Sequence, residues 1–100
     1  MPHQLAPEVE DELADIWYYV ASHSDGVDAA DRLIDSITSR FFLLSEYPRI
    51  GRRRDDLRPG LRSFSVRGYL IIYRIVEEKS GEDVFILHIV HGRRDYEAMF

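Results

Sequence analysis

Two stretches of the chain are apolar at nearly every position, and they restrict the possible folds more than any other feature. They are residues 69–76 and residues 84–90, and we interpret both as β-strands. The side chains of a strand alternate between the two faces of its sheet, so strands of this kind need cover on both faces. A chain of 100 residues has room for one domain, residues 1–100, and therefore for little covering structure.

The first half of the chain predicts two helices. Pro7 fits the first turn of a helix, where its missing N–H is not needed, and that helix should end near Ser22 in a run of turn-forming residues. A second helix is predicted from Val27 to Glu46, because Pro48 blocks its continuation. The short connection between them predicts an antiparallel hairpin. The apolar residues at helical spacing, all expected in the core, are Val9, Leu13, Ile16, Trp17 and Val20, then Ala30, Leu33, Ile34, Ile37, Phe41 and Leu44.

The second half predicts a loop followed by a sheet. Residues 49–60 contain three glycine or proline residues and are interpreted as an arginine-rich loop. Tight connections at Arg67-Gly68 and at residues 78–82 then join three strands into an antiparallel meander. The predicted strands are Leu61–Val66, Tyr69–Glu77 and Asp83–His91. With a short extended segment at His3–Leu5, these elements predict an α+β fold in two layers, a helical hairpin packed on a small antiparallel sheet of order β-α-α-β-β-β.

The predicted helical hairpin can cover only one face of that sheet. We therefore expect an apolar patch on the other face, and we expect a partner protein to cover it. The alternative is that residues 49–60 and the tail after Gly92 fold over the patch.

Charge is distributed unevenly along the chain, although the net charge is only −5. Residues 1–48 carry two arginines against ten acids, residues 49–76 carry eight arginines against two acids, and residues 77–100 carry three bases against six acids. This asymmetry indicates at least one surface for a charged partner. Arginine is also the base best suited to planar contacts with carboxylates. Direct binding of nucleic acid is not favoured, because the pI is about 5.3 and no nucleic-acid-binding motif accompanies the arginines.

Several classes of protein are excluded by what the sequence lacks. It has no cysteine, hence no disulfide or thiolate chemistry, and no apolar run long enough to span a membrane. The acidic N-terminus does not resemble a signal peptide, so we expect a cytoplasmic protein with no membrane partner. His88 and His91 lie three apart on one strand and should point to opposite faces, which is poor geometry for a metal. We interpret His88 as a hydrogen-bonded core residue and expect no metal and no cofactor.

Six short segments spread over the whole chain form a pattern that points to a known family. They are Leu5-Ala6-Pro7, Asp15-Ile16, Tyr47-Pro48-Arg49-Ile50-Gly51-Arg52, residues 56–64, Ile72-Tyr73-Arg74 and His91-Gly92-Arg93-Arg94-Asp95. Together with the order of the predicted elements, these segments resemble the ParE branch of the ParE/RelE superfamily of toxins, and no single segment is diagnostic by itself.

The resemblance implies the toxin of a type II toxin–antitoxin module, which inhibits growth by binding and poisoning DNA gyrase and is neutralised by a ParD-like antitoxin. We expect the cluster after the last strand to bind the target, and exposed tyrosines together with arginines to bind an acidic antitoxin. The expected target-binding residues are Arg93, Arg94, Asp95 and Tyr96. The expected antitoxin-binding residues are Tyr18, Tyr19, Arg53, Arg58, Arg62 and Arg74.

Two alternatives stay open within the superfamily. The RelE branch cleaves messenger RNA on the ribosome with two lysines, two arginines and a tyrosine, and in this chain Leu61, Ser63, Leu70 and Phe100 occupy four of those positions, while Arg94 matches the fifth. Because the acid–base groups are missing, the residues argue against catalysis of that type. A ribonuclease built from His91, Arg94 and Tyr96 is the remaining enzymatic candidate. The second alternative is an inactive relative that only binds antitoxin.

Overall fold

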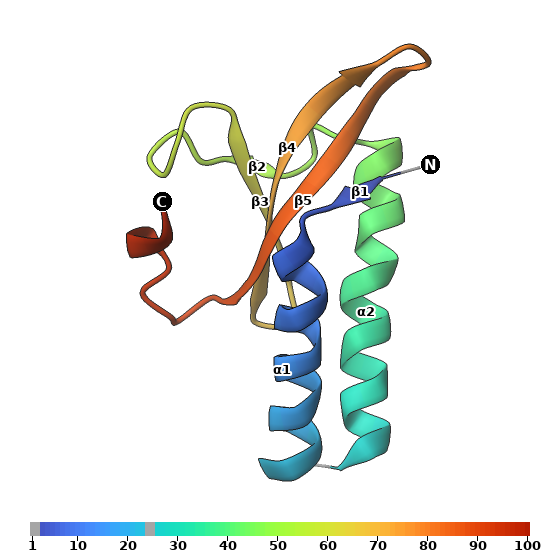
Figure 1. The fold of residues 1–100 in the computed structure, drawn as a ribbon, viewed down its shortest axis with the longest axis vertical. Helices are drawn as coiled ribbons and strands as arrows, with labels where there is room; N and C mark the ends of the chain where they lie inside the picture. The colour runs from blue at the N-terminus through green and yellow to red at the C-terminus, as the bar shows by residue number, and fades with distance from the viewer. Residues whose placement is uncertain (1–2, 24–25) are drawn as a thin grey trace.

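Two helices pack on one face of a five-stranded sheet in the computed structural model, which describes residues 3–23 and 26–100. Figure 1 shows the helices running antiparallel beside the sheet, as predicted. The strand order is β1-β5-β4-β3-β2. The elements are β1 (Gln4–Leu5), α1 (Pro7–His23), α2 (Val27–Glu46), β2 (Arg52–Arg53), β3 (Leu61–Val66), β4 (Tyr69–Glu78), β5 (Gly81–His91) and a 3₁₀ helix (Glu97–Met99). The α+β fold is therefore confirmed; the connection at residues 24–25 lies outside the described residues.

The sheet is mixed, whereas an antiparallel meander was expected. At one edge β1 runs parallel to β5, and at the other β2 pairs antiparallel with β3 inside the segment that was predicted to be loop. Both edge strands are two residues long, too short to show an alternating pattern of apolar residues. The β4–β5 hairpin also continues further than predicted, because Glu78 pairs with Gly81 and leaves a two-residue turn.

A β-bulge at Leu87 changes which side chains of β5 face the helices. Ile72 of β4 lies opposite His88, and the next residue, Tyr73, lies opposite Ile86, so Leu87 is the extra residue. As a result Ile86 and Ile89 both belong to the core under the helices. The bulge also carries His91 to the helix side of the sheet, opposite Tyr69.

The core between helices and sheet contains most of the residues predicted from helical spacing. Four of the predicted residues are not members of this core: Trp17, Val20, Ala30 and Ile34. Ala30 is nevertheless fully buried, and the half-buried indole of Trp17 donates a hydrogen bond from its Nε1 to Oδ1 of Asp31 at 2.8 Å. The indole N–H needs an acceptor, and the acid on α2 supplies one at the edge of the hairpin. The buried members of the core are Ala6, Val9, Ile37, Phe41, Leu44, Val66, Ile71, Tyr73, Val84, Ile86 and Ile89.

The other face of the sheet is covered by the chain itself, so the expectation that it requires a partner is wrong. A second apolar cluster forms there around Leu61, Ile72 and Val90, all buried. Figure 1 shows the loop after β2 and the C-terminal segment on the side of the sheet away from the helices. The side chains that pack on the cluster are Leu57 from that loop, Tyr96, Met99 and Phe100 from the tail, and Leu70 and Leu87 from the sheet.

His3 lies beside β1 between two aromatic rings of α2. Its ring meets Phe41 and Phe42 edge-on, with centroids 5.5 and 5.0 Å away, and its buried Nδ1 has no hydrogen-bond partner among the described residues. Burial lowers the pKa of His3, and the negative charge of Asp83 opposes that shift in part. The folded protein therefore favours a neutral imidazole at this position.

We expect His3 to make folding stability depend on pH. Because its pKa is lower in the folded state, the unfolded chain binds this proton more readily, and the free energy of unfolding should fall as pH decreases below about 6.5. His3→Phe keeps an aromatic ring and removes the titration, so its stability should fall less over the same range. Denaturant unfolding of both proteins at several pH values between 7.5 and 5 measures this; parallel curves would contradict it.

Candidate functional site

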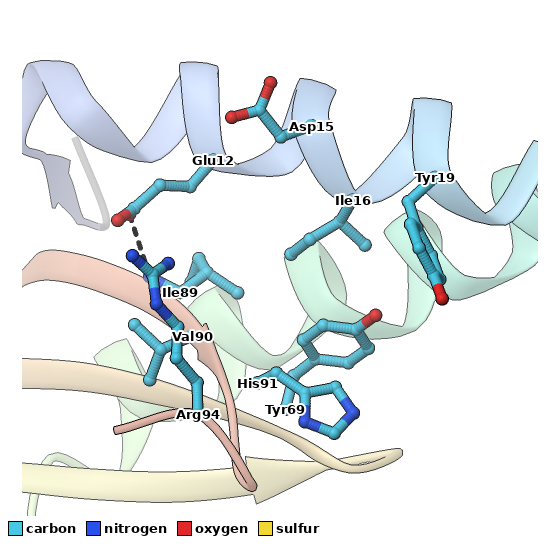
Figure 2. Close-up of a pocket in the computed structure, with 9 residues that line it drawn as sticks. All are labelled: Glu12, Asp15, Ile16, Tyr19, Tyr69, Ile89, Val90, His91 and Arg94. Atoms are coloured by element: carbon cyan, nitrogen blue, oxygen red, sulfur yellow. Dashed lines mark hydrogen bonds between the residues drawn. The ribbon is translucent and has the colours of Figure 1, made fainter. Parts of the chain in front are cut away.

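A pocket of about 360 Å³ opens between α1 and the C-terminal end of β5. Figure 2 shows Ile16 and Tyr19 descending from the helix toward Tyr69 and the residues of β5. Its floor is apolar, because Ile89 and Val90 are buried and Ile16 is half-buried. The complete lining is Glu12, Asp15, Ile16, Tyr19, Tyr69, Ile89, Val90, His91 and Arg94.

Glu12 joins α1 to the outer edge of β5, beyond the short strand β1. Its Oε1 accepts the backbone N–H of Ile89 at 3.0 Å, and its Oε2 lies 2.9 Å from Nδ1 of His88. One carboxylate thus satisfies a strand N–H that β1 does not reach. His88 is hydrogen-bonded, as predicted, but it is only half-buried and belongs to neither apolar core, whereas a core residue was predicted. Its ring also meets Phe100 edge-on at 5.5 Å.

Tyr69 and His91 form the wall of the pocket at the end of the sheet. Their rings meet edge-on with centroids 5.2 Å apart, and the exposed Tyr19 lies across the opening from them. Burial raises the pKa of the Tyr69 hydroxyl, and the nearby Tyr19 adds to the shift. Tyr69 therefore stays a neutral hydrogen-bonding group at physiological pH.

The two arginines that follow β5 are exposed and lie close to this wall. The backbone N–H of Arg94 donates to the carbonyl of His91 at 3.0 Å, and that of Arg93 donates to the His91 ring at 3.1 Å. Figure 2 shows the Arg94 side chain extending across the pocket toward Glu12. Arg93 lines a second pocket, of about 480 Å³, which shares Tyr69 and His91 with the first.

The structure separates Tyr96 from the other predicted residues of this cluster. Tyr96 packs on the second apolar face, where its hydroxyl accepts a hydrogen bond from Nη1 of Arg54 at 3.1 Å. His91 and Arg94 line the pocket beside α1, and Tyr96 does not. Asp95 is exposed, and within residues 3–23 and 26–100 no ion pair joins it to Arg94. The three groups of the candidate ribonuclease are therefore not brought together here.

Three arginines of the segment 49–60, namely Arg49, Arg53 and Arg54, pair with acids of the molecule itself. Arg54 is buried and holds Asp56 through two hydrogen bonds of 3.1 and 3.0 Å, which raise the pKa of the guanidinium and lower that of the carboxyl. Arg49 pairs with Glu82 through both oxygens and lowers its pKa. The sequence could not show the partner of Arg49, because Glu82 lies 33 residues away.

The predicted antitoxin-binding residues do not form one continuous surface. Tyr18 and Tyr19 are 66% and 60% exposed on α1, while the arginines lie on the loop and the sheet. Arg53 pairs with Asp55 at 2.9 Å, and Arg62 donates a hydrogen bond to the carbonyl of Gly51 at 2.8 Å. The guanidinium of Arg74 lies over the ring of Phe85, 5.1 Å from its centroid. Arg58 is exposed.

Only some of the residues that line the pocket beside α1 were predicted from the sequence. His91, Arg94 and Tyr19 were predicted as site residues, Ile16 was predicted only as a core residue, and Glu12 and Tyr69 were not predicted. A signal did exist, because Glu12, Ile16 and Tyr19 recur at helical spacing on one face of α1. What the sequence did not show is that the bulge turns His91 toward that face.

The described part of the chain shows neither a cluster of metal-ligating side chains nor a membrane-spanning helix. Residues 3–23 and 26–100 contain no group of three or more histidine, aspartate or glutamate side chains placed to hold a metal ion. None of the helices in those residues is both long enough and apolar enough to cross a membrane.

Comparison with known proteins places the chain in a family. A family model described as "ParE toxin of type II toxin-antitoxin system, parDE" matches residues 4–96. The chain belongs to the ParE toxin family. Toxin ParE3 of Caulobacter vibrioides is 47% identical over 75 residues, 75% of this chain and 71% of that protein. Toxin ParE1 of Mycobacterium tuberculosis is 31% identical over 93 residues, 93% of this chain and 91% of that protein.

A solved structure agrees with the fold of this ParE family member. It is described as a chromosomal ParDE TA system from P. aeruginosa, and it superposes with a TM-score of 0.70 over 91% of this chain and 95% of that one. The sequences are 21% identical, so the likeness concerns the fold. The resemblance drawn from the segments at residues 5–7, 47–52 and 91–95 is confirmed by the family match.

Proposed function

We propose that this ParE family toxin inhibits growth by binding and poisoning DNA gyrase, and that a ParD-like antitoxin neutralises it. The observation that carries the proposal is the family match over residues 4–96. The site adds support, because a pocket with an apolar floor, lined by the exposed Arg94 and followed by Arg93 in the adjoining pocket, is suited to binding another protein. Since gyrase acts on chromosomal DNA, the proposal also places the protein in the cytoplasm.

Binding explains the geometry better than cleavage of RNA does. General acid–base chemistry needs a proton donor and a proton acceptor close to one reacting phosphate. Leu61 lies in an apolar cluster and Ser63 is buried, at the positions where the RelE branch carries its lysines. Tyr96, the tyrosine of the candidate ribonuclease, packs on the opposite face of the sheet from the pocket that His91 and Arg94 line.

The proposed contacts with the antitoxin rest on exposure and charge. Tyr18 and Tyr19 present aromatic area on α1, and Arg58 and Arg74 present positive charge away from it. We propose that an acidic antitoxin segment contacts both regions, which would require it to wrap around the toxin.

The proposal predicts a charge-dependent inhibition of gyrase. Purified toxin should inhibit supercoiling of plasmid DNA, and Arg93→Glu should raise the concentration needed by about tenfold, because it reverses a charge at the proposed contact. Arg32→Glu is a matched control, since Arg32 is exposed on α2, away from the pocket. It should inhibit like the wild type.

Primer extension on translated messages, with the same preparations, tests the alternative. Cleavage of the messages without inhibition of gyrase would replace the proposed function by a ribonuclease. Neither activity, together with binding of the antitoxin, would identify an inactive relative.

A further inference from the structure

The two pockets at the end of the sheet adjoin each other, and we treat them together as one surface feature. They share Tyr69 and His91, and together they run from Ile16 on α1 to Arg93 beyond β5. We call this feature the end groove. Its α1 half has a mainly apolar floor, whereas its other half lies along the turns at Gly68 and Gly92. Those turns are held together, because the N–H of Gly92 donates to the carbonyl of Gly68 at 2.9 Å.

The charged side chains differ between the two ends of the end groove. The α1 wall carries Glu12 and Asp15, and the Arg94 side chain extends toward Glu12. The opposite end carries Arg93, which makes no ion pair within residues 3–23 and 26–100. Arg67 is exposed on the neighbouring β3–β4 turn. An anionic group is therefore disfavoured beside α1 and favoured at the Arg93 end.

We propose that the end groove holds a large apolar side chain of the target protein, followed directly in its chain by a carboxylate. The apolar side chain lies on Ile16, Tyr69 and Ile89, and the carboxylate lies at Arg93. This assignment rests on the proposed function, to which it adds the chemistry of the contact and its orientation. Apolar anchors that fill a pocket, ringed by polar contacts, are where interfaces concentrate their binding energy.

The apolar half of the end groove indicates that the ligand needs an apolar side chain as well as a negative charge. Ile89 is 2% exposed and belongs to the core under the helices, so the floor of the groove is part of the close-packed interior. Tyr69 is half-buried and held against His91, which gives the wall a fixed shape. A ligand that offers only negative charge would leave this floor unused.

Three capped dipeptides test the proposal without gyrase. Backbone amide signals of the full-length protein are followed by NMR during titration with N-acetyl-Phe-Glu-amide, N-acetyl-Phe-Gln-amide or N-acetyl-Ala-Glu-amide. The first should shift the signals of Tyr69, Ile89 and Arg93. Loss of the charge should weaken binding by about threefold, and loss of the aromatic ring by about tenfold.

Variants locate the two halves of the contact. Arg93→Gln should bind the Phe-Glu and Phe-Gln probes equally, whereas the control Arg32→Gln should keep the threefold preference. Equal binding of all three probes, or shifts confined to residues 49–60, would overturn the proposal. So would the absence of any shift.

The gyrase assay then separates the two proposals. If the wild type does not inhibit gyrase but the probes behave as expected, the gyrase assignment fails and the chemistry of the end groove stands. If gyrase is inhibited and the probes do not discriminate, the proposed function stands and the groove assignment fails.

Discussion

Gly51→Ala is expected to destabilise the protein by about 3 kcal/mol, because the added methyl group would collide with a buried ring. A Cβ at Gly51 would lie 2.3 Å from the hydroxyl oxygen of Tyr73 and 2.6 and 2.8 Å from two of its ring carbons. Tyr73 is fully buried, and its hydroxyl donates to the carbonyl of Pro48 at 2.6 Å and accepts the N–H of Gly51 at 3.0 Å. The ring therefore has no free space to move into.

A double-mutant cycle separates this collision from any intrinsic effect of alanine at the position. Tyr73→Leu removes the three atoms that the new methyl group would meet. In that background Gly51→Ala should cost less than about 1 kcal/mol, so the two substitutions should be strongly coupled. Denaturant unfolding of the four proteins measures the coupling. Equal costs of Gly51→Ala in both backgrounds would show that the contact with Tyr73 is not the cause.

The helices and the three long strands could be predicted because their sequence patterns are long. Residues 27–46 show helical spacing over five turns and end just before Pro48, and α2 has those bounds. The turn at Arg67-Gly68 was equally visible, and both residues have positive φ, at 50° and 87°. Glycine at the second position makes this conformation accessible without strain there.

Features that depend on partners distant in sequence could not be predicted. Whether two residues such as Arg52 and Arg53 form a strand is decided by β3, which offers its open edge to them. The bulge at Leu87 is likewise a property of the β4–β5 pairing, because Leu87 itself has no special residue type.

The C-terminal tail, residues 93–100, covers part of the second face of the sheet. Its apolar residues, Tyr96, Met99 and Phe100, have the spacing of one helical turn and could have been identified as a covering segment. Their role was underestimated from the sequence, because the eight residues after Gly92 are too few for a long element. The need for cover on both faces was correct, and the tail and Leu57 meet it.

Two polar residues of the candidate site were predicted from the sequence, but the shape of the site was not. His91 and Arg94 were identified because polar groups beyond a strand end often carry function. The apolar floor escaped notice, since Ile16 and Ile89 are indistinguishable from other core residues until the bulge and the packing of α1 place them beside His91.

Arg54→Met is expected to lower the free energy of unfolding by about 2 to 3 kcal/mol, because hydrogen bonds of a buried charged group are lost. Arg54 is 7% exposed and connects three segments, through Asp56 in the loop, Ser63 on β3 and Tyr96 in the tail. Its loss should also loosen the tail. Hydrogen exchange at the backbone amides of residues 96–100 should therefore become faster than in the wild type.

Arg53→Met is a matched control, because it makes the same substitution at the neighbouring arginine. Arg53 also pairs with the acid two residues ahead of it, but its side chain is 73% exposed, against 8% for Arg54. Exposed pairs contribute little, so Arg53→Met should change stability by less than about 0.5 kcal/mol and leave the tail unaffected. Equal effects of the two variants would mean that arginine content of the loop matters and that the buried position of Arg54 does not.

The pH dependence of Arg54→Met provides a second, independent signature. Hydrogen bonds from Arg54 lower the pKa of Asp56, so this pair stabilises the fold above the ordinary aspartate pKa of 3.8, and the contribution is lost as pH falls through the lowered value. The wild type should therefore lose stability over that acidic range more steeply than Arg54→Met. If both lose it equally, Asp56 is not stabilised through Arg54, and the connection between loop and tail must rest on Tyr96 and Ser63 alone.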